Sequence, residues 1–519
     1  MLPDYLNILF SVILLLLTLF ISTLFFKSFR KQSTKFRPPP SPPSLPIIGH
    51  LHLLTGSVMP KSFQTLAALY GPLIQLHLGA STCVVVSNAQ VAKEVLKTHE
   101  LNFSNRPQFG SSNYFLYKGS YFITAPYGPH WRFMRKICMT KLLSTSQLNK
   151  FTHVREQEIT KLLEFLIMCG NEGKDSDLSM ELTTLTNNIL CRMAMSSSRM
   201  GHAANDAKEI HHLIKEFFDV GAKLSVGEIL GPLGKFDLFG YGKKLTKIVG
   251  NFDQIVERIM KELEEKMDVL NDHKDCEIEG GDMMDILLQV YKDANAEVRL
   301  TRNDIKAFFL DIFLAGTDTI AVALQWAMVE IINHPKVFNE IRAEIDSVVG
   351  LCKLVKESDV QNLTYLQAVV KEVLRLHPTA PFVLRQSAED CKINGYDIKG
   401  EARTLVNVYA IMRDPESWVK PEEFIPERFL INPDGINGQE NLMENKGQDF
   451  MYLPFGNGRR GCPGASLALS VLHVTIGALI QCFDWKVKDG DKVDINEGFS
   501  AGLAKPLVCY PVIHCNPFK

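Results

Sequence analysis

Residues 455–464, with the sequence FGNGRRGCPG, constrain this chain more strongly than any other segment. They hold one cysteine, Cys462, among glycines and close to two arginines, and a run of good helix formers starts at Ala465. This pattern predicts a helix N-terminus at the cysteine, with Pro463 in the first turn. Helix N-termini carry partial positive charge and unpaired N–H groups, which glycines allow to approach sulfur closely. We therefore expect Cys462 to favour the thiolate, which is a metal ligand or a nucleophile.

Three interpretations of this segment are open from its residues alone. Cys462 can be a buried structural cysteine, because free cysteine is commonly buried. The spacing Gly456-x-Gly458-x-x-Gly461 also matches the dinucleotide-binding fingerprint, but that site needs a βαβ unit, and no alternation of strand and helix surrounds the motif. The third interpretation is ligation of haem iron by the Cys462 thiolate, which favours cleavage of an O–O bond.

The order Phe455-x-x-Gly458-x-Arg460-x-Cys462-x-Gly464 resembles the haem-binding signature of the cytochrome P-450 monooxygenases. The resemblance implies a mainly α-helical fold with small β-sheets. It also implies that the fold holds haem b, with the Cys462 thiolate as axial ligand to the iron. Phe455, Arg460 and Gly464 would then lie against the haem.

The composition is that of a large globular protein. The chain has 519 residues, of which 46% are hydrophobic, enough to bury a large core. Its net charge of −2 gives no attraction toward nucleic acid. The 11 cysteines include no C-x-x-C pair, which argues against a disulfide framework and structural zinc and favours a reducing compartment. Because no linker or internal repeat divides residues 47–519, we expect them to form one domain.

Residues 1–27 have the composition of a membrane anchor. Residues 5–26 are a stretch of 22 uncharged, mostly apolar residues, long enough for a helix to cross a hydrocarbon core of roughly 30 Å. Basic residues follow from Lys27 to Arg37 with no acid among them, so the positive-inside rule places the C-terminal side in the cytosol. A cleaved signal peptide is the rival interpretation, but the basic start, short apolar core and small-residue cleavage site that it needs are missing.

Residues 28–46 are basic and then rich in proline, and we expect them to form a hinge between the anchor and the domain. Six prolines lie within residues 38–46 and favour a stiff polyproline II segment. A ligand for an SH3-type domain is the alternative, but the globular sequence resumes directly at Ile47. The segment resembles the hinge of microsomal P-450 enzymes. This implies a single-pass protein of the endoplasmic reticulum membrane with a cytosolic catalytic domain.

A predicted helix after Pro129 carries Trp131 and Arg135 at i and i+4, so their side chains share one face. From the residues alone, the segment can also be an exposed basic turn. The pattern W-x-x-x-R resembles the family motif that faces the haem, in which the arginine pairs with a propionate, as suits guanidinium geometry. Arg385 resembles the second propionate-binding arginine of the family.

Residues 301–333 are predicted to form one long helix, with a cap at Thr301 and an end before Pro335. At 1.5 Å per residue it spans about 45 Å, the width of a domain, so we expect it to cross the middle of the fold. Its centre, residues 315–319 (AGTDT), places small side chains on one face. Glycine inside a helix costs about 1 kcal/mol relative to alanine, which indicates either close helix packing or a ligand against this face.

The pattern A-G-x-D-T in this helix resembles the oxygen-binding segment of the P-450 family. The resemblance implies that Ala315 and Gly316 lie against the haem. It also implies two catalytic residues. The Thr319 hydroxyl would hydrogen-bond bound oxygen, and Asp318 would bring protons from solvent.

Glu372 and Arg375 are at i and i+3 on a predicted helix that ends at Pro378. A single pair of this kind is usually a solvated surface contact worth a few tenths of a kcal/mol. Downstream, residues 424–429 (FIPERF) resemble the P-E-R-F segment of the family, whose arginine here is Arg428. The resemblance implies a buried network of Glu372, Arg375 and Arg428 next to the haem loop.

These signatures occur in the family's order, and the resemblance covers essentially the whole chain. It is strongest to plant microsomal members grouped around the flavone and isoflavone synthases and the triterpenoid oxidases, and residues 103–107 (FSNRP) share this likeness. It implies electrons from NADPH through a separate reductase, with a cytochrome b-type protein as a further candidate donor. An acidic partner would dock by electrostatic steering near the basic helix. The residues expected there are Trp131, Arg132, Arg135 and Lys136.

The substrates implied are O2 and a small but bulky apolar plant metabolite, which the enzyme hydroxylates. Overall similarity favours a triterpenoid, and a flavonoid oxidase is the alternative within the family. A haem-binding carrier or gas sensor without oxygenase activity is the alternative from a different class. The presence of both Thr319 and Asp318 argues against that alternative.

Overall fold

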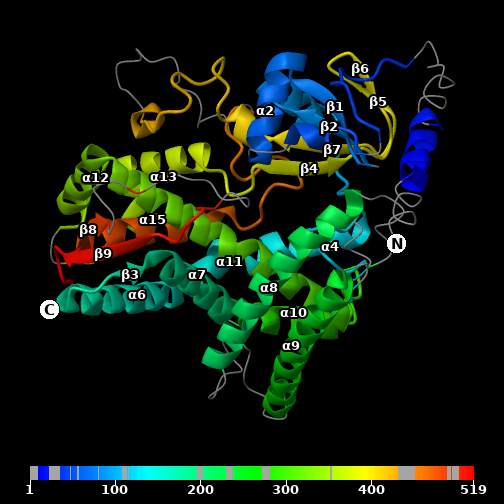
Figure 1. Ribbon diagram of the computed structural model, residues 1–519. Coiled ribbons are helices and arrows are strands. Elements are labelled where there is room, and N and C mark those ends of the chain that lie inside the picture. The colour runs from blue at the N-terminus through cyan, green and yellow to red at the C-terminus, as the bar shows by residue number, and fades with distance from the viewer. Residues whose placement is uncertain are drawn as a thin grey trace, which may run out of the picture.

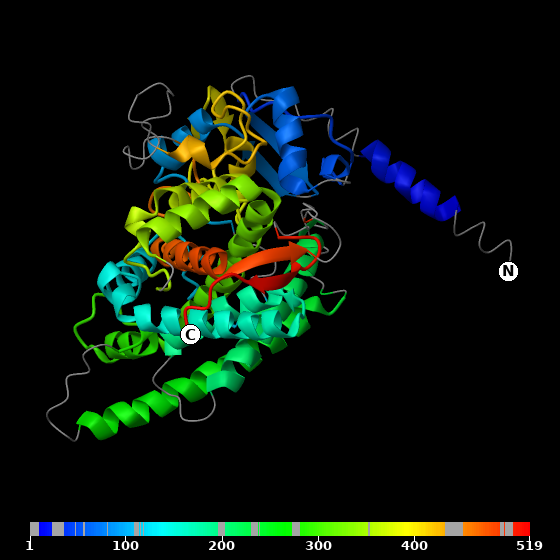
Figure 2. The same cartoon turned by 90° about the vertical axis from the view of Figure 1, so that its left-hand side faces the viewer.

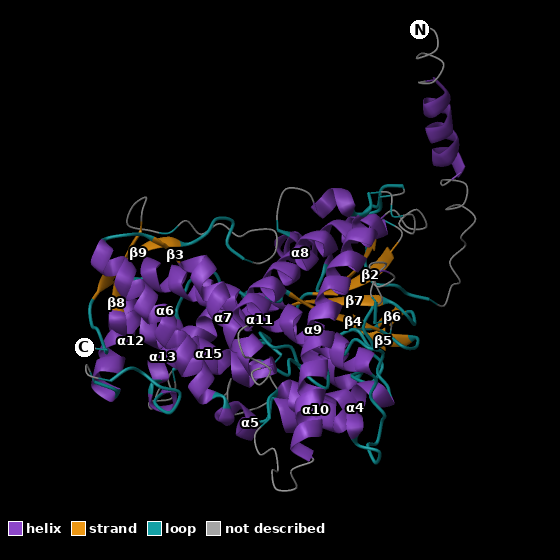
Figure 3. Ribbon diagram, turned by 90° about the horizontal axis from the view of Figure 1, so that it is seen from below, coloured by secondary structure: helices purple, strands orange, loops and turns teal. Residues whose placement is uncertain are grey.

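Helices dominate the protein, and small β-sheets lie at its two ends (Figures 1 and 3). The expectation of a mainly α-helical fold with small sheets is therefore confirmed. The structure is a computed structural model that describes residues 10–22, 36–46, 48–54, 58–79, 81–107, 114, 116–117, 119–195, 203–229, 237, 239–271, 281–350, 353–430, 450–487, 493 and 502–518.

Helix α11, Arg302–Asn333, is the long central helix that the sequence predicts (Figure 1). The Asp304 N–H donates to the Thr301 hydroxyl, and the Thr301 N–H donates to the Asp304 carboxylate over 2.7 Å. This capping box fixes where the helix begins. Helix α7, Leu178–Met195, packs along α11, and helix α15, Ala465–Cys482, contacts it as well.

The remaining helices surround this centre, and short 3-10 and π-helical turns join several of them. The further α-helices are α2 Met59–Tyr70, α3 Ala89–Lys93, α4 Pro129–Ile137, α5 Thr145–Lys150, α6 Thr152–Glu172, α8 Ala203–Ile229, α9 Tyr241–Asn271, α10 Met283–Lys292, α12 Pro335–Val348, α13 Thr364–Leu376 and α14 Val408–Ile411. The short turns are η1 Leu51–Leu54, η2 Glu94–Thr98, η4 Cys138–Leu142, η6 Val360–Asn362 and η7 Pro426–Phe429.

The largest sheet has the strand order β1-β2-β7-β4 and supports one side of the site. Its strands are β1 Leu73–Leu78, β2 Ser81–Val86, β7 Arg403–Asn407 and β4 Phe382–Gln386. Strand β2 pairs antiparallel with β1 and parallel with β7, and β4 pairs antiparallel with β7. At the other end, β3 Ser176–Asp177, β9 Val508–Ile513 and β8 Phe483–Val487 form a second sheet. The hairpin of β5 Cys391–Ile393 and β6 Tyr396–Ile398 lies beside the largest sheet (Figure 3).

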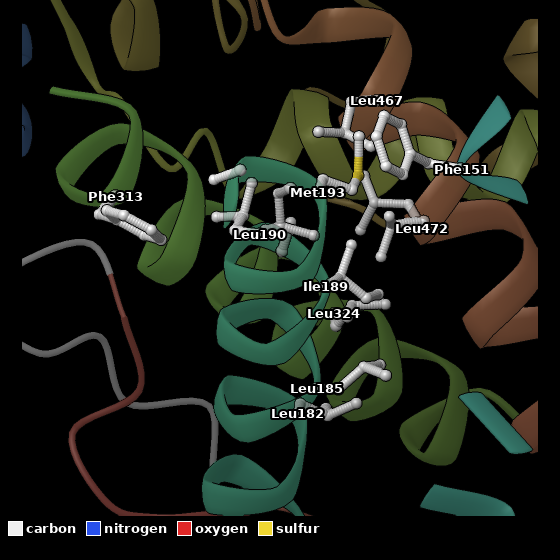
Figure 4. Packing of buried hydrophobic residues seen from close by; sticks show 14 of the residues in the cluster. Phe151, Leu182, Leu185, Ile189, Leu190, Met193, Phe313, Leu324, Leu467 and Leu472 are labelled. Atoms are coloured by element: carbon white, nitrogen blue, oxygen red, sulfur yellow. The ribbon is translucent and has the colours of Figure 1, made fainter. Parts of the chain in front are cut away.

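The core is built from apolar side chains that α7 and its neighbours direct toward one another. Leu182, Leu185 and Ile189 lie on one stripe of α7, all buried, and Figure 4 shows them beside Leu324 of α11 and Leu472 of α15. Their spacing of three and four residues keeps them on one helix face. Burial of each such side chain contributes about 1.5–3 kcal/mol, so this packing holds α11 and α15 in fixed positions.

The apolar N-terminal segment contains a helix, Phe10–Ser22, that stands apart from the body (Figure 2). Its side chains are exposed, with Phe10 at 67% and Leu15 at 61%. Residues 1–9 and 23–35, which complete the predicted anchor and the basic part of the hinge, lie outside the described residues. Helix Phe10–Ser22 is apolar but shorter than a membrane span. Among the described helices, α11 and α15 are long and apolar enough to span a membrane, but most of their side chains are buried in the body.

The described part of the predicted hinge, residues 36–46, is bound to the body. The Arg37 N–H donates to the Asp397 carboxylate over 2.8 Å, and the Asp397 N–H donates to the Arg37 carbonyl over 2.7 Å. The Gln75 N–H donates to the Pro40 carbonyl over 2.8 Å. This segment therefore follows the edges of β1 and β6 and fixes where the chain leaves the domain.

Candidate active site

The cysteine loop, residues 455–464, is a tight turn that leads into α15. The Cys462 N–H donates to the Phe455 carbonyl over 2.9 Å and closes the loop. Gly456 and Gly458 have φ values of +66° and +73°, a left-handed conformation that residues with a side chain rarely adopt. Gly456 and Gly458 are therefore required by the backbone of the loop.

Helix α15 begins at Ala465 with Gly464 as its N-cap, so Pro463 precedes the helix and does not occupy its first turn as expected. The Cys462 side chain is exposed, yet nearby protein atoms desolvate it and raise the pKa of its thiol above the usual value. The Gly464 N–H and the Arg135 charge act in the opposite direction. The expectation that these groups alone favour the thiolate is therefore wrong. A coordinated metal cation deprotonates a thiol, and would supply the missing stabilisation.

Three arginines, Arg106, Arg385 and Arg460, converge beside the cysteine loop. Burial and mutual repulsion lower the pKa of Arg385 and of Arg460 to about 9 each, and burial lowers that of Arg106. The Nε of Arg106 and the Nη1 of Arg460 are buried without a hydrogen-bond partner among the described residues. Buried charges need an opposite charge or hydrogen bonds. The cluster therefore fits a dianionic group such as the two carboxylates of haem.

Sequence reasoning identified Arg385 and Arg460 and missed Arg106. The only sequence feature that pointed to Arg106 was its position within residues 103–107, because no local pattern shows that a guanidinium group will be buried. Trp131 packs against this arginine cluster. The guanidinium carbon of Arg460 lies 4.2 Å from the centre of the Trp131 indole ring, which is a cation–π contact. Phe122 stacks on Trp131 with ring centres 6.1 Å apart.

Arg135 lies with Trp131 on the inner face of α4. Its Nη1 donates to the Gly461 carbonyl over 2.9 Å, so it contacts the cysteine loop directly. Arg132 and Lys136 are exposed on the outer face, where Lys136 pairs with Glu297 at 3.1 Å. Of the residues expected at a docking surface, Trp131 is therefore buried, whereas Arg132 and Lys136 are accessible.

The centre of α11 has one face toward open space and one toward α7. Ala315 is exposed, and the Thr319 hydroxyl donates to its carbonyl over 2.6 Å. A Cβ at Gly316 would lie 2.8 Å from Cδ1 of Leu190 on α7, so close helix packing accounts for this glycine. The two small residues therefore have different roles. Gly316 allows α7 to pack closely against α11, and Ala315 leaves the helix surface beside Thr319 accessible.

Asp318 is half-buried, and burial raises the pKa of its carboxyl. The charges of His211 and Lys215 on α8 act in the opposite direction. The Asp318 carboxyl group is therefore close enough to α8 to feel the charges of that helix, on which Lys215 is exposed.

Glu372, Arg375 and Arg428 come together in a buried network. The Glu372 carboxylate accepts from Nε and Nη2 of Arg375 over 2.7 and 2.9 Å and from Nε of Arg428 over 3.1 Å. It also accepts the Ile425 N–H over 2.9 Å. Neither Glu372 nor Arg375 has any exposed side-chain surface, so this is not the solvated pair that an isolated i, i+3 spacing usually gives.

The network connects to the cysteine loop through Met412. The Nη1 of Arg375 donates to the Met412 carbonyl over 2.8 Å, and the Leu453 N–H approaches the Met412 sulfur at 3.4 Å. Leu453 in turn accepts the Gly456 N–H over 3.0 Å. These contacts place the acid–arginine network directly behind the loop that carries Cys462.

Residues 39–510 match the family model for Cytochrome P450. The chain is 44% identical to the 3,9-dihydroxypterocarpan 6A-monooxygenase of Glycine max over 511 residues, which cover 97% of this chain and 98% of that protein. It is 41% identical to the beta-amyrin 24-hydroxylase of Glycine max over 509 residues, or 96% and 97% of the two chains. A solved zebra fish cytochrome P450 with progesterone superimposes with a TM-score of 0.72 at 25% identity, covering 88% of this chain and 100% of that one. The chain therefore belongs to the cytochrome P450 family of haem-thiolate monooxygenases.

Proposed function

We propose that this protein hydroxylates a bulky apolar plant metabolite of the triterpenoid class, with haem b held by Cys462. The observation that carries the proposal is the arginine cluster beside the cysteine loop. The Cys462 side chain is exposed on this loop, and Arg106 and Arg460 have buried donors that find no partner in the described part of the chain. A thiol and a dianion-binding cluster side by side suit one ligand that presents both a metal and two carboxylates.

When bound, haem supplies the chemistry of O2 activation, which thiolate ligation favours. Cys462 would bind the haem iron through its sulfur. Arg106, Arg385 and Arg460 would hold the carboxylates. Arg135 would also pair with one of them, and it keeps the cysteine loop in place through its bond to the Gly461 carbonyl. Trp131 would hold the Arg460 guanidinium group in place through their cation–π contact.

Thr319 and Asp318 are the proposed catalytic residues. The Thr319 hydroxyl donates to the carbonyl of the exposed residue Ala315 over 2.6 Å, and we propose that it turns from this carbonyl to hold a proton at its Oγ1 for the reaction. Asp318 has a raised pKa, so it takes up a proton more readily than an exposed carboxylate. We propose that it receives protons from the α8 side and passes them toward Thr319.

The side chains near the centre of α11 support a neutral and bulky substrate. Ala315 of α11 is small, apolar and exposed, and so is Ala380 just before β4. Asp311, also in this part of α11, is buried and accepts the Ile123 N–H over 3.0 Å, so it offers no free charge to a ligand. Large apolar pockets with few fixed charges suit poorly soluble molecules.

The likeness to a beta-amyrin hydroxylase supports a triterpenoid. The likeness to a monooxygenase named for 3,9-dihydroxypterocarpan supports the alternative, a flavonoid-type substrate. Both relatives match nearly the whole chain at similar identity, so the test below includes a substrate of each class.

We further propose a division into a membrane anchor at residues 1–27, a hinge at 28–46 and the catalytic domain at 47–519. The exposed apolar helix Phe10–Ser22 supports the anchor, and the basic residues after it support insertion in the endoplasmic reticulum membrane with the domain in the cytosol. Electrons would come from NADPH through a separate reductase, with a cytochrome b-type donor as a second source. Arg132 and Lys136 are accessible for docking such a partner.

The test uses microsomes that contain the full chain and a plant reductase. The reduced protein should give the carbon monoxide band of a thiolate ligand, and NADPH should drive addition of one oxygen atom to a beta-amyrin-type triterpenoid, read by mass. Oxidation of a dihydroxypterocarpan without oxidation of the triterpenoid would support the flavonoid alternative. A thiolate band without any substrate-dependent NADPH use would indicate a carrier or sensor, and absence of the band would overturn ligation by Cys462.

A further inference from the structure

Glu100 contacts the cysteine loop from a segment that the proposed chemistry does not use. The segment follows η2 and is held by its own hydrogen bonds. The Ser104 hydroxyl donates to the Glu100 carbonyl over 2.6 Å, and the Phe103 N–H donates to the His99 carbonyl over 3.1 Å. The Glu100 carboxylate therefore projects from an ordered turn toward the loop.

The Glu100 carboxylate binds both the main chain and the side chain of Arg459. Its Oε1 accepts the Arg459 N–H over 2.6 Å, and its Oε2 accepts from Nη1 over 2.9 Å. The Glu100 side chain is 26% exposed, so these bonds are partly shielded from water. Hydrogen bonds to an ionised acceptor are shorter and stronger than neutral ones.

Gly458 provides the space that this contact needs. A Cβ at Gly458 would lie 2.5 Å from the Oε1 of Glu100, far inside van der Waals contact. Its positive φ excludes most other residues independently. The glycine thus permits both the turn and the close approach of the carboxylate.

The same segment holds the next residue of the loop as well. The Arg460 Nε donates to the Ser104 carbonyl over 2.9 Å, inside the protein. Glu100 and Ser104 therefore fix two consecutive residues, Arg459 and Arg460, just before Cys462. The negative charge of Glu100 also favours the charged form of Arg385, which the other arginines repel.

We infer that Glu100 is a positioning residue for Cys462. By fixing the turn at Gly458 and Arg459, it sets the direction in which the loop presents the cysteine sulfur, and its charge partly offsets the crowded arginines. The inference rests on the proposed ligation of haem by Cys462. It assigns to Glu100 no contact with haem, oxygen or substrate.

The experiment compares full-length E100A and E100Q with the parent and with a control, E94Q. Glu94 lies in the same turn region and also accepts a main-chain N–H, that of Asn394 over 2.9 Å, but on the β5–β6 hairpin and not on the cysteine loop. Two readouts are needed, namely the rate of haem transfer to excess apomyoglobin and the position of the carbon monoxide band of the reduced protein.

E100A loses both hydrogen bonds to Arg459. It should therefore lose haem at least about tenfold faster than the parent, the factor that one charged hydrogen bond supplies, and part of its carbon monoxide band should move from the thiolate to the thiol position. E100Q keeps the side-chain shape and one acceptor, so it should fall between the parent and E100A. E94Q should match the parent in both readouts.

Parent-like haem release and an unshifted band in E100A and E100Q would overturn the inference, and so would an equal defect in E94Q. If E100A yields no folded protein, E100Q alone decides by the same criteria. Failure of the parent to show a thiolate band would be a failure of the proposed function, and it is visible before any variant is compared.

Discussion

Replacing Glu372 by alanine should destabilise the domain by about 4 kcal/mol. The carboxylate is fully buried and accepts four hydrogen bonds, three of them from the guanidinium groups of Arg375 and Arg428. After the substitution, Arg375 keeps its bonds to the carbonyls of Met412 and Pro421 but loses its only charge partner in the network. Removing one member of a buried ion pair typically costs about 3–5 kcal/mol, because the remaining charge stays desolvated.

The assay is urea unfolding of the reconstituted protein, followed by tryptophan fluorescence and by the haem absorption. Trp418 is a suitable reporter, because the guanidinium carbons of Arg375 and Arg428 lie 5.2 and 6.0 Å from its ring centre. The matched control is Glu423→Gln, which breaks an exposed pair with Lys420 at 3.0 Å in the same region. Exposed pairs contribute about 0–1 kcal/mol, so the control should unfold close to the parent.

A Glu372→Ala protein that unfolds within about 1 kcal/mol of the Glu423→Gln control would refute this reasoning. It would mean that water reaches the two guanidinium groups and that the network is not buried in solution. Replacing Glu372 by glutamine separates charge from shape, because the amide can still accept one bond while the charge is lost. We expect it to lie between the alanine variant and the control.

Four further outcomes are expected. Cys462→Ala should abolish haem binding, and a variant that kept the thiolate-type carbon monoxide band would exclude this ligand. Thr319→Ala should retain haem and still consume NADPH, while product formation falls by about 10²-fold to 10⁴-fold and peroxide is released. An unchanged ratio of product formed to NADPH consumed would mean that Thr319 has only a packing role. Burial raises the pKa of Asp311 from 3.8 to about 7, so its carboxyl destabilises the fold as pH rises from about 4 through 7, by roughly 4 kcal/mol at most. Asp311→Asn should flatten this dependence in unfolding curves between pH 5 and 8, and equal slopes would contradict it. Deleting residues 1–27 should leave a domain that still binds haem. Loss of haem binding would mean that these residues are part of the folded domain and not only a membrane anchor.

Much of the scaffold was predictable because local chemistry encodes it. Thr301 followed by an acid three residues later defines the start of α11, and the structure begins the helix there. The two expectations that were wrong are of another kind. The position of Pro463 depends on where α15 first forms its hydrogen bonds, and the pKa of Cys462 depends on how many protein atoms surround the sulfur.

The sequence by itself determined the family and the conformation of the cysteine loop, because the left-handed glycines and the helix that follows are local requirements of the backbone. Only the tertiary structure decided which charges meet. Arg106 and Glu100 reach the loop from hundreds of residues away, and Gly316 faces Leu190 on another helix. Burial and charge pairing arise between segments that are distant in sequence, so no local pattern reports them.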